Sequence, residues 1–394
     1  MDRYDVIIVG GGPAGSSCAW KLSQAGLTTL VLDAKAFPRV KPCAGWITPQ
    51  VVETLQLDVD SYRSENRGNP TDEPDSRRTW QPIHGFRCGV IGGRSVDVRY
   101  DHAISFGIRR CEFDTYLLHR CGASLRLGEP VEQLQRDPDG WTVNARYRAP
   151  MLVGAGGHRC PVARMLGEET SGSSNSSDSS NSAKPDRSAP VVVAREVEFP
   201  APNDCERIDP TMPHLYFCED LLGYGWCVRK GAYLNIGLGR TDHRSLPHHV
   251  EQFVDFLRRR NQLQCELPTW MGHAYRLYEH AAPRLYGDRV LLVGDAAGLA
   301  YPVSGEGIRP AVESGLLAAA VIQQAADYRG ESLAEYHRLL TRRLGMPRQP
   351  GIEAMLPGAW MNFLGPRLLT NRSFCRHVLL DKWFLHRGQA ALAN

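Results

Sequence analysis

Several features that mark other classes of protein are missing from this chain of 394 residues. Its 11 cysteines lie scattered between Cys18 and Cys375, and no two of them are spaced as CxxC. This pattern offers neither a zinc spacing nor a disulfide framework, so we expect no metal site and a reducing, cytoplasmic setting. No stretch approaches about 18 consecutive apolar residues, so we expect no membrane-spanning helix. The opening MDRYDVIIVG has the layout of neither a signal peptide nor a transit segment.

A strong charge of one sign is also absent. The formal net charge is +3 and the pI is near 8.3. No run of Lys and Arg accompanies a recognisable nucleic-acid-binding module, so we expect no nucleic-acid partner. Hydrophobic residues make up 42% of the chain and charged residues 23%. This composition is globular, and the length predicts two domains or one elaborated domain.

The chain begins with the pattern of a strand, a glycine-rich turn, a helix and a second strand. Residues 4–9 form a short apolar run rich in Val and Ile, which predicts a buried parallel strand. Small and apolar residues at helical spacing follow over residues 13–26, and LTTLVLD predicts a second strand ending at Asp33. The segment therefore predicts a βαβ unit.

The turn of this unit reads GGGPAG and places Gly10, Gly12 and Gly15 in the GxGxxG spacing of dinucleotide-binding proteins. The three glycines permit a tight turn, a close approach of the backbone to a pyrophosphate, and close packing of helix on strand. The helix N-terminus then faces the negative charge. Asp33, about twenty residues further on, suits a ribose 2′-hydroxyl. The sequence thus predicts a Rossmann-type nucleotide-binding domain.

A second sheet interrupts this domain. VVVAREVEF, YGWCVRKG and YLNIGLG predict its strands and VEQFVDFLRRR a helix, after which DRVLLVGDAAG returns to a buried strand. The tract between residues 168 and 188 is dense in Ser, Asn and Gly, which predicts a disordered surface loop. We therefore expect a nucleotide-binding domain over 1–75, 100–167 and 272–330, a substrate domain over 76–99 and 189–271, and a helical C-terminal region over 331–394.

A second glycine-rich turn lies in residues 290–319. A strand ends at Gly294 and Asp295, several glycines and a proline keep the backbone open, and an apolar helix begins near Ile308. Such a turn presents backbone amides and a helix N-terminus to a ligand at the strand ends. Asp295 is a candidate for holding a ligand hydroxyl.

Taken in order, GGGPAG, RRCEFDTYLL, GYGWCVRKGAYLNIGLG and GDAAGLAYPVSGEGI resemble the FAD-dependent geranylgeranyl reductases, which are kin of aromatic hydroxylases and flavin halogenases. The resemblance covers most of the chain. It implies an α/β fold with a discontinuous Rossmann-type FAD-binding domain, an inserted β-sheet substrate domain and a helical C-terminal region. The residues that it assigns to FAD are Gly10, Gly12, Gly15, Asp33, Arg110 near the phosphates or ribityl chain, Gly294, Asp295 on the ribityl hydroxyls, and Gly305, Gly307 and Ile308 beside the flavin ring.

The resemblance also gives a meaning to KPCAGWITP, residues 41–49. Many members of the family carry KxCGG in this position, close to the isoalloxazine, so Cys43 is a candidate catalytic residue on the flavin side. The alternative is a small buried hydrophobe, the usual state of a free cysteine. Trp46 in the same stretch is a candidate for the substrate pocket. Glu306 is a candidate acid or base by its position in the flavin turn, with orientation of the backbone as the alternative.

Tyr224 and Trp226 alternate with Gly225, so both point to one face of a strand. They are candidates for lining an apolar substrate pocket, and ordinary core packing is the alternative.

Two departures from the family bear on specificity. Gly156 stands where a GADG motif has its aspartate, and Val228 and Arg229 replace Phe-Pro of a YxWxFPK motif. The substrate and the electron donor, NADPH or a redox protein, are left open by these changes.

We therefore expect an FAD-dependent oxidoreductase that reduces carbon–carbon double bonds of a small apolar, isoprenoid-type substrate. The alternative is a flavin-dependent monooxygenase or halogenase. Against halogenation, the sequence lacks WxWxIP, and against hydroxylation it lacks the aspartate of GADG.

The tail over residues 342–387 mixes basic residues with Trp360, Phe363, Trp383 and Phe384. That mixture suits peripheral contact with a membrane, and a solvated helical cap is the alternative.

Overall fold

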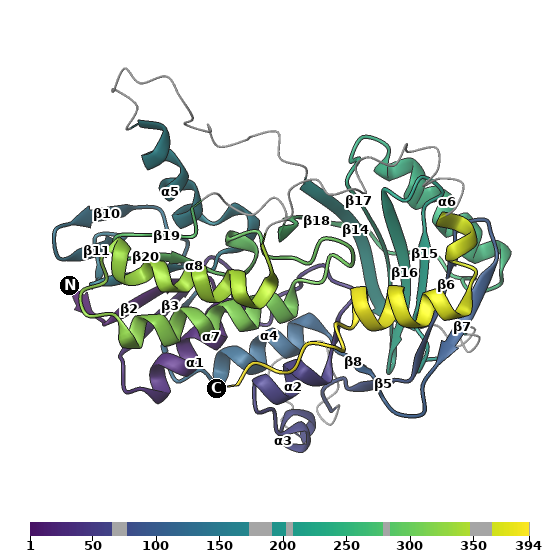
Figure 1. Ribbon diagram of the computed structural model, residues 1–394, viewed down its shortest axis with the longest axis horizontal. Coiled ribbons are helices and arrows are strands. Elements are labelled where there is room, and N and C mark those ends of the chain that lie inside the picture. Colours follow the sequence, from purple (N-terminus) through teal and green to yellow (C-terminus); the bar gives the residue numbers. More distant parts are fainter. Residues whose placement is uncertain (65–76, 173–190, 202–207, 279–283, 347–364, 394) are drawn as a thin grey trace.

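Two large β-sheets lie toward opposite ends of the long axis of the molecule (Figure 1). The computed structural model describes residues 1–64, 77–172, 191–201, 208–278, 284–346 and 365–393. The sheet near the N-terminus is covered by helices. The other sheet is crossed by the last helix of the chain.

The first sheet has six strands in the order β19-β20-β13-β2-β3-β9, and it is parallel except for the β19–β20 pair. Its strands come from three separate parts of the sequence, which makes this domain discontinuous as predicted. Their bounds are β2 (Val6–Val9), β3 (Thr29–Asp33), β9 (Ser124–Leu127), β13 (Met151–Gly154), β19 (Tyr286–Gly287) and β20 (Val290–Leu292). β2 and β20 are fully buried, as expected for strands of a parallel sheet covered on both faces.

Helices α1 (Pro13–Gln24), α7 (Ile308–Gln324) and α8 (Gly330–Leu344) lie together on one side of this sheet (Figure 1). α4 (Arg110–His119) also packs against α1. The glycine-rich turn makes this packing possible. Gly10 has a φ of 117°, a conformation that only glycine adopts readily, and a Cβ at Gly15 would overlap the carbonyl oxygen of Gly10. The predicted βαβ unit is confirmed.

Two small sheets were not predicted from the sequence. β1 (Asp2–Arg3), β12 (Tyr147–Ala149), β11 (Gly140–Val143) and β10 (Leu134–Asp137) form one of them. β4 (Trp46–Ile47), β8 (Ser105–Gly107) and β5 (Gln81–Ile83) form the other, and helices α2 (Pro49–Thr54) and α3 (Val59–Ser64) follow β4 along the chain. Strands of two to four residues carry too little periodicity to be recognised in a sequence.

The second large sheet has seven strands in the order β18-β14-β17-β16-β15-β6-β7. It is antiparallel except for the β15–β6 pair. The strands are β6 (Gly85–Val90), β7 (Ser95–Arg99), β14 (Val191–Pro200), β15 (His214–Phe217), β16 (Gly223–Lys230), β17 (Tyr233–Arg240) and β18 (Met271–Arg276). β18 continues this sheet across the boundary that we predicted at residue 272, because its pairing with β14 extends to Arg276.

The two faces of this sheet are covered differently. α6 (Leu246–Arg259) packs on one face through Phe253 and Phe256, which contact Tyr216. The other face carries the apolar side chains of β15 and β16 and the short helix α10 (Arg372–Phe374), which continues into the π-helix η6 (Cys375–Phe384). Figure 1 shows this last helix crossing the strands.

The C-terminal aromatic residues differ from the predicted membrane-facing pattern where the structure describes them. Phe384 is fully buried, and it contacts Phe217 and Tyr224 edge-on. Trp383 packs partly buried against the same core. Trp360 and Phe363 lie outside the described residues. Burial of Phe384 against the sheet stabilises the fold and removes its ring from any surface.

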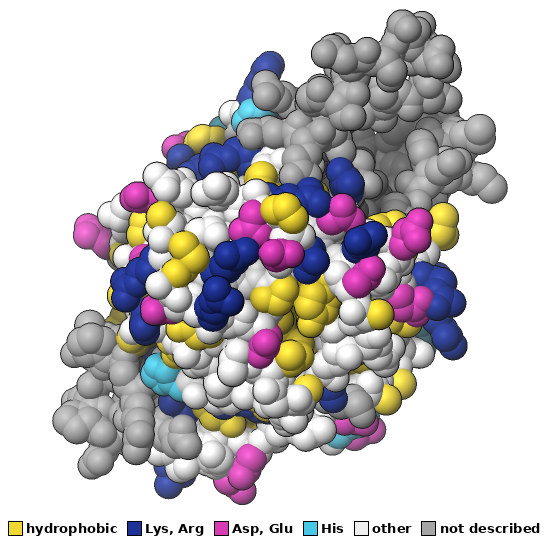
Figure 2. Space-filling model, turned by 90° about the vertical axis from the view of Figure 1, so that its left-hand side faces the viewer, with side chains coloured by type: hydrophobic (Ala, Val, Ile, Leu, Met, Phe, Trp, Pro, Cys, Tyr) yellow, Lys and Arg dark blue, Asp and Glu magenta, His cyan; other side chains and the backbone are white. Residues whose placement is uncertain are grey.

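Other parts of the surface bear on the predicted loop and on membrane contact. Residues 168–172 of the predicted serine-rich loop continue α5 (Pro161–Gly172), and residues 173–188 lie outside the described part. Among the described residues, no helix has both the length and the apolarity needed to cross a bilayer. Basic and acidic side chains are interspersed on the face at the N-terminal end of the molecule (Figure 2).

Candidate functional site

The first element of the site is the turn at the N-terminus of α1. Asp33 accepts a hydrogen bond from the backbone N–H of Gly11 at 2.8 Å and another from the N–H of Lys35 at 2.9 Å. Gly12 is the N-cap of α1, no side chain caps the helix, and its first turn contains no acidic residue. These first-turn amides therefore suit a phosphate or other anion. Asp33 lies at the end of β3, beside the turn, as the sequence predicts.

Asp295 is the charged centre of the second turn. Its carboxylate lies 3.0 Å from the Lys41 ammonium and 3.7 Å from the ring of His273. Burial by itself raises the pKa of Asp295, but the charge of Lys41 and the nearby imidazole of His273 outweigh it and hold the pKa well below its usual value. Asp295 is thus an anion throughout the physiological range. Lys41 also ties the Cys43 stretch to this turn.

Arg110 is buried and already engaged. Its guanidinium makes two hydrogen bonds of 2.8 Å to the carboxylate of Asp114, one turn along α4. Arg39 approaches the same carboxylate at 3.4 Å. Arg110 also lies close to the Cys43 thiol and to His273. The structure therefore brings Arg110 to the site, where Asp114 orients it.

Residues 41–45, which we call the Cys43 loop, lie between the two large sheets. The carbonyl oxygen of Cys43 accepts a hydrogen bond of 3.3 Å from Asn235 on β17. Two tyrosines of the same sheet, Tyr224 and Tyr275, also lie near Cys43. Cys43 itself is half-buried, whereas eight of the ten described cysteines are buried. Cys43 also packs against the buried cluster that contains Ile47 and Phe113, so its role in the site stays a prediction.

The same tyrosines reach the glycine-rich turn of residues 301–307. The Tyr224 hydroxyl donates a hydrogen bond to the carbonyl of Ser304. A Cβ at Gly305 would overlap the Tyr275 hydroxyl, so only a glycine fits against this ring. Gly307 lies beside Asp295, and Ile308 begins α7. The predicted residues Cys43, Tyr224 and Gly305 are thus brought together from distant parts of the chain.

An apolar wall flanks this junction. Tyr224 and Trp226 point to the same face of β16, as predicted, and the indole N–H of Trp226 donates to Asn235 at 2.7 Å. Trp46 and Trp226 are both buried in one cluster with Phe86, and the rings of Trp46 and Phe86 lie 5.7 Å apart, edge to face. Their role in lining a substrate pocket stays a prediction. Trp46 and Trp226 serve core packing as well.

Glu306 is a buried acid inside the second turn. Neither of its carboxyl oxygens has a hydrogen-bond partner of good geometry among the described residues, although the backbone amide of Arg309 faces the group. Burial, opposed by the charge of Arg309 and reinforced by that of Glu313, raises the pKa of Glu306 to about 7. A substantial fraction of Glu306 therefore carries a proton at neutral pH, as a general acid must.

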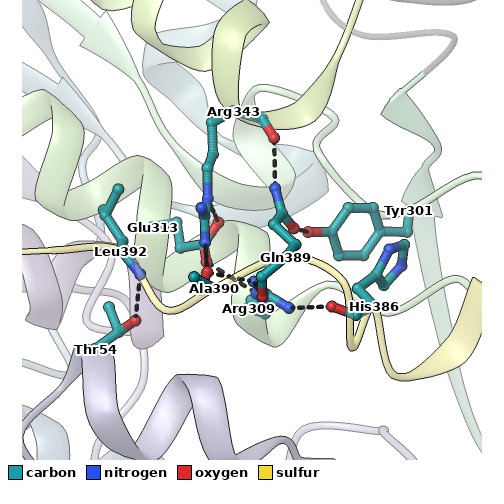
Figure 3. A network of polar contacts seen from close by, with 9 residues as sticks. All are labelled: Thr54, Tyr301, Arg309, Glu313, Arg343, His386, Gln389, Ala390 and Leu392. Atoms are coloured by element: carbon teal, nitrogen blue, oxygen red, sulfur yellow. Dashed lines mark hydrogen bonds and ion pairs between the residues drawn. The ribbon is translucent and has the colours of Figure 1, made fainter. Parts of the chain in front are cut away.

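The C-terminal tail fastens the second turn to the rest of the domain (Figure 3). Arg309, at the start of α7, pairs with Glu313 at 2.9 Å and donates to the carbonyls of Gln389 and Ala390. Arg343 pairs with Glu313 from α8 at 2.6 Å. The chain end reaches α2, where the N–H of Leu392 donates to Thr54 at 3.0 Å.

Tyr301 links this tail to the turn itself. Its ring stacks on that of His386 with centroids 3.8 Å apart, and its hydroxyl donates to Gln389 at 3.2 Å. From the sequence we expected the tail to lie at the surface, either in contact with a membrane or as a solvated helical cap. Its contacts with the second turn were not predicted. Lys41, His273 and Tyr275, which surround Asp295 and Gly305, were not predicted either. Of these three residues, only Lys41 could have been found from the sequence, because it lies in the KPCAG stretch that matches the family motif.

The arrangement fits an FAD molecule. Gly10 and Gly15 let backbone segments pack closely around the turn, and a Cβ at Gly12 would meet only the Arg39 guanidinium, at 3.3 Å. The uncapped N-terminus of α1 therefore suits a pyrophosphate. Asp33 lies at the end of β3 where a ribose would bind, and ionised Asp295 beside Gly294 and Gly307 suits the hydroxyls of a ribityl chain. No group of three or more His, Cys, Asp or Glu side chains that could hold a metal occurs within the described ranges.

Comparisons with known proteins agree with this assignment. The family model described as FAD binding domain matches residues 3–192. A digeranylgeranylglycerophospholipid reductase of Methanocaldococcus jannaschii is 26% identical over 355 residues, which cover 86% of this chain and 82% of the relative. A geranylgeranyl diphosphate reductase of Rhodobacter capsulatus is 27% identical over 332 residues, which cover 80% of this chain and 74% of the relative.

Solved structures share the fold. A geranylgeranyl bacteriochlorophyll reductase-like protein of Thermoplasma acidophilum superposes with a TM-score of 0.68 at 19% identity, over 94% of this chain and 88% of that protein. A halogenase solved in complex with FAD also superposes with a TM-score of 0.68, at 16% identity, over 95% of this chain and 78% of that one. The predicted fold class and the predicted FAD cofactor are confirmed.

Proposed function

Because this chain carries an FAD binding domain and resembles the geranylgeranyl reductase-like flavoproteins along most of its length, we propose that it reduces carbon–carbon double bonds of an apolar, isoprenoid-type substrate. The observation that carries this proposal is the junction between the two large sheets. There the Cys43 loop, the ionised Asp295 and the buried acid Glu306 meet the apolar wall of Trp46, Tyr224 and Trp226.

Different residues of the chain would bind the cofactor, orient the substrate and supply the proton. When bound and reduced, FAD would supply the hydride. Asp33, Asp295 and the amides of the two turns would hold the cofactor. The aromatic wall would orient the alkene and exclude water, and Glu306 would hold the proton that the second carbon requires. The electron donor is an expectation only, NADPH or a redox protein.

The alternative is oxygen activation on the same scaffold, in a monooxygenase or halogenase. The superposition on a halogenase shows the shared fold, whereas the two relatives named above, which match most of the chain, are reductases. The two functions separate when FAD-loaded protein is reduced without oxygen and then mixed either with a geranylgeranyl-chain substrate or with oxygen. We expect the alkene to reoxidise the flavin and to yield a product heavier by two hydrogens. A hydroxylated or halogenated product would favour the alternative.

Asp33→Ala should weaken retention of FAD about 10- to 100-fold, because a hydrogen bond to a charged group contributes about 1.5–3 kcal/mol. The substitution also removes the acceptor of the Gly11 amide. Asp33→Asn, which keeps one acceptor oxygen, serves as the control. Its affinity for FAD should lie between that of the native protein and that of Asp33→Ala. The measurement is FAD content after gel filtration and the dissociation constant by titration. Unchanged affinity in the alanine variant would show that Asp33 makes no contact with the cofactor.

Cys43→Ser should leave FAD content nearly unchanged while altering turnover or the pattern of products. The thiol lies near Tyr224 and Tyr275, on the side of the junction that faces the aromatic wall. Cys265→Ser is the matched control, since Cys265 is the other half-buried cysteine in the described part of the chain. If Cys43→Ser lowers only the melting temperature and leaves turnover per folded molecule intact, Cys43 is a packing residue.

Glu306→Gln should lower turnover at pH 7 by about 100-fold or more, the usual contribution of a general acid. In the native protein turnover should fall as the pH rises through about 7, because the protonated form of Glu306 is then lost. The glutamine variant should show no such fall. Glu331→Gln on the exposed start of α8 is the control. A native pH profile that is retained in Glu306→Gln would exclude this role.

A further inference from the structure

One buried amide connects the Cys43 loop with the apolar wall. Asn235 lies on β17, and its side chain is fully buried. Its amide oxygen accepts the indole N–H of Trp226 at 2.7 Å, and its amide nitrogen donates to the carbonyl of Cys43 at 3.3 Å. The same nitrogen donates to the Glu198 carboxylate at 3.3 Å. Buried amides are normally paired, and here the partners come from three separate segments of the fold.

The partners of Asn235 determine which end of its amide faces each neighbour. An indole N–H can only donate, so it must face the amide oxygen. A backbone carbonyl and an ionised carboxylate can only accept, so both must face the amide nitrogen. Turning the amide over would set donor against donor at Trp226 and acceptor against acceptor at Cys43. Asn235 therefore keeps a single orientation.

Glu198 fixes the amide from the neighbouring strand. It lies directly across from Asn235 in the pairing of β14 with β17. Its carboxylate pairs with the fully buried Lys230 and, at 3.1 Å, with Arg109. Burial by itself raises the pKa of Glu198, but these two cations outweigh it and lower the pKa below its usual value. Glu198 is thus an anion that accepts from Asn235 at neutral pH.

A glycine lets the indole of Trp226 reach this amide. In the sheet, Gly237 pairs with Trp226 on one side and with the buried Glu196 on the other. A Cβ at Gly237 would overlap the indole, so the ring lies across β17 only because this position has no side chain. Asn235 lies two residues before Gly237 and therefore on the same face of the strand. Its oxygen meets the indole N–H on that face.

The other end of the amide holds the middle of the Cys43 loop. At one end of the loop, Lys41 pairs with the carboxylate of the second turn at 3.0 Å. At the other end, the carbonyl of Gly45 accepts from the N–H of Ile108 at 2.8 Å. Between them, the carbonyl of Cys43 is joined to the large sheet by Asn235. The amide therefore sets how the middle of the loop lies against β17.

We propose that Asn235 is a positioning residue that fixes the Cys43 loop relative to Trp226. In the proposed function the loop lies on the flavin side of the site and Trp226 on the substrate side, so this amide would hold the two sides in register. Without it, the Cys43 carbonyl and the indole N–H would both lose a buried partner, and each would have to move to find another. The consequence for turnover rests on the proposed function, whereas the hold on the loop does not.

Hydrogen exchange of the FAD-loaded protein tests the hold on the loop without any substrate. The reporter is the amide of Ile108, which donates to Gly45 at the end of the loop. Asn235→Leu keeps the volume and removes the polar groups. In this variant we expect the Ile108 amide to exchange about 3- to 10-fold faster than in the native protein, as for the loss of one hydrogen bond. Peptides of α6, on the other face of the sheet, should keep their native protection.

A double variant separates the two ends of the amide. Asn235→Asp together with Glu198→Gln keeps the net charge of the network and leaves an acceptor for the Trp226 indole, but it removes the donor to Cys43. We expect Ile108 to exchange faster, as in Asn235→Leu. The indole N–H should stay protected in the NMR spectrum, where its signal is identified by its absence in Trp226→Phe. Loss of the indole protection without a change at Ile108 would contradict the proposal.

The control variant is Asp220→Ala, which removes the partner of Arg240 at the far end of β17. It should leave exchange of Ile108 unchanged, even if the melting temperature falls. If Ile108 exchanges at the native rate in both Asn235 variants, Asn235 does not hold the loop. If Asp220→Ala accelerates Ile108 as much as Asn235→Leu does, the effect reflects global stability, and the proposal is wrong.

Turnover shows whether this positioning matters for the reaction. In both Asn235 variants, at native FAD content, we expect kcat for a geranylgeranyl-chain substrate to fall about 10- to 100-fold, the cost of a small misplacement of reacting groups. Asp220→Ala should keep the native kcat. If the native protein does not reduce alkenes, the proposed function fails while the exchange result still stands. If it does and the Asn235 variants keep the native kcat, only the positioning role is overturned.

Discussion

Gly10→Ala should abolish retention of FAD and lower the stability of the nucleotide-binding domain. Gly10 has a φ of 117°, and such a backbone conformation costs a residue with a Cβ about 1–3 kcal/mol. The new methyl group would also overlap the carbonyl of Ala155, at the end of the neighbouring strand. The methyl group would be attached to the backbone just after β2, and the carbonyl belongs to the backbone just after β13. Neither group can therefore move away without displacing the turn.

The measurement is FAD content after gel filtration together with the melting temperature, and we expect FAD content below about one-tenth of native from a strain of this size. Gly167→Ala on α5 is the matched control. A Cβ at Gly167 meets nothing within 4 Å, and alanine is the better helix former, so stability should stay equal or rise. Native FAD content in Gly10→Ala would mean that the turn tolerates a Cβ and that its glycine is dispensable.

Glu313→Ala should lower the free energy of unfolding by about 3–5 kcal/mol, the usual cost of removing one partner from a buried ion pair. Glu313 and Arg309 are each 1% exposed, and Arg343 approaches the same carboxylate from α8. Without Glu313, two guanidinium groups would face each other in a poorly solvated space. Arg309 would then hold the C-terminal tail less firmly (Figure 3).

Unfolding in urea measures this loss, and limited proteolysis near Arg387 reports release of the tail. Glu335→Ala is the control, because Glu335 pairs with Arg338 on the exposed side of α8 and such a pair contributes about 0–1 kcal/mol. Glu313→Gln, which keeps the shape and one acceptor, should give an intermediate loss. Equal stability of Glu313→Ala and Glu335→Ala would show that the two arginines find other partners.

Local patterns were sufficient for the nucleotide-binding unit. GGGPAG between two apolar runs predicts β2, α1 and β3 because each requirement lies within about thirty residues, the span of one βαβ unit. The alternation of Tyr224 and Trp226 likewise follows from the period of a strand, and the sheet confirms it. The boundary at residue 272 was wrong by several residues because β18 has little hydrophobic pattern and is held in the sheet by its partner β14.

The sequence by itself determined the dinucleotide turn, the FAD cofactor through its motifs, and the existence of a second sheet. Only the tertiary structure decided which side chains share a site, because contacts such as Lys41 with Asp295 and Tyr224 with Ser304 join residues far apart in the chain. The protonation state of a buried carboxyl group is likewise decided only by the tertiary structure. Glu196 and Glu306 resemble any other glutamate in the sequence, and their raised pKa values arise from burial and from neighbours that only the fold assembles. Desolvation depends on the whole packed structure, so no local pattern carries it.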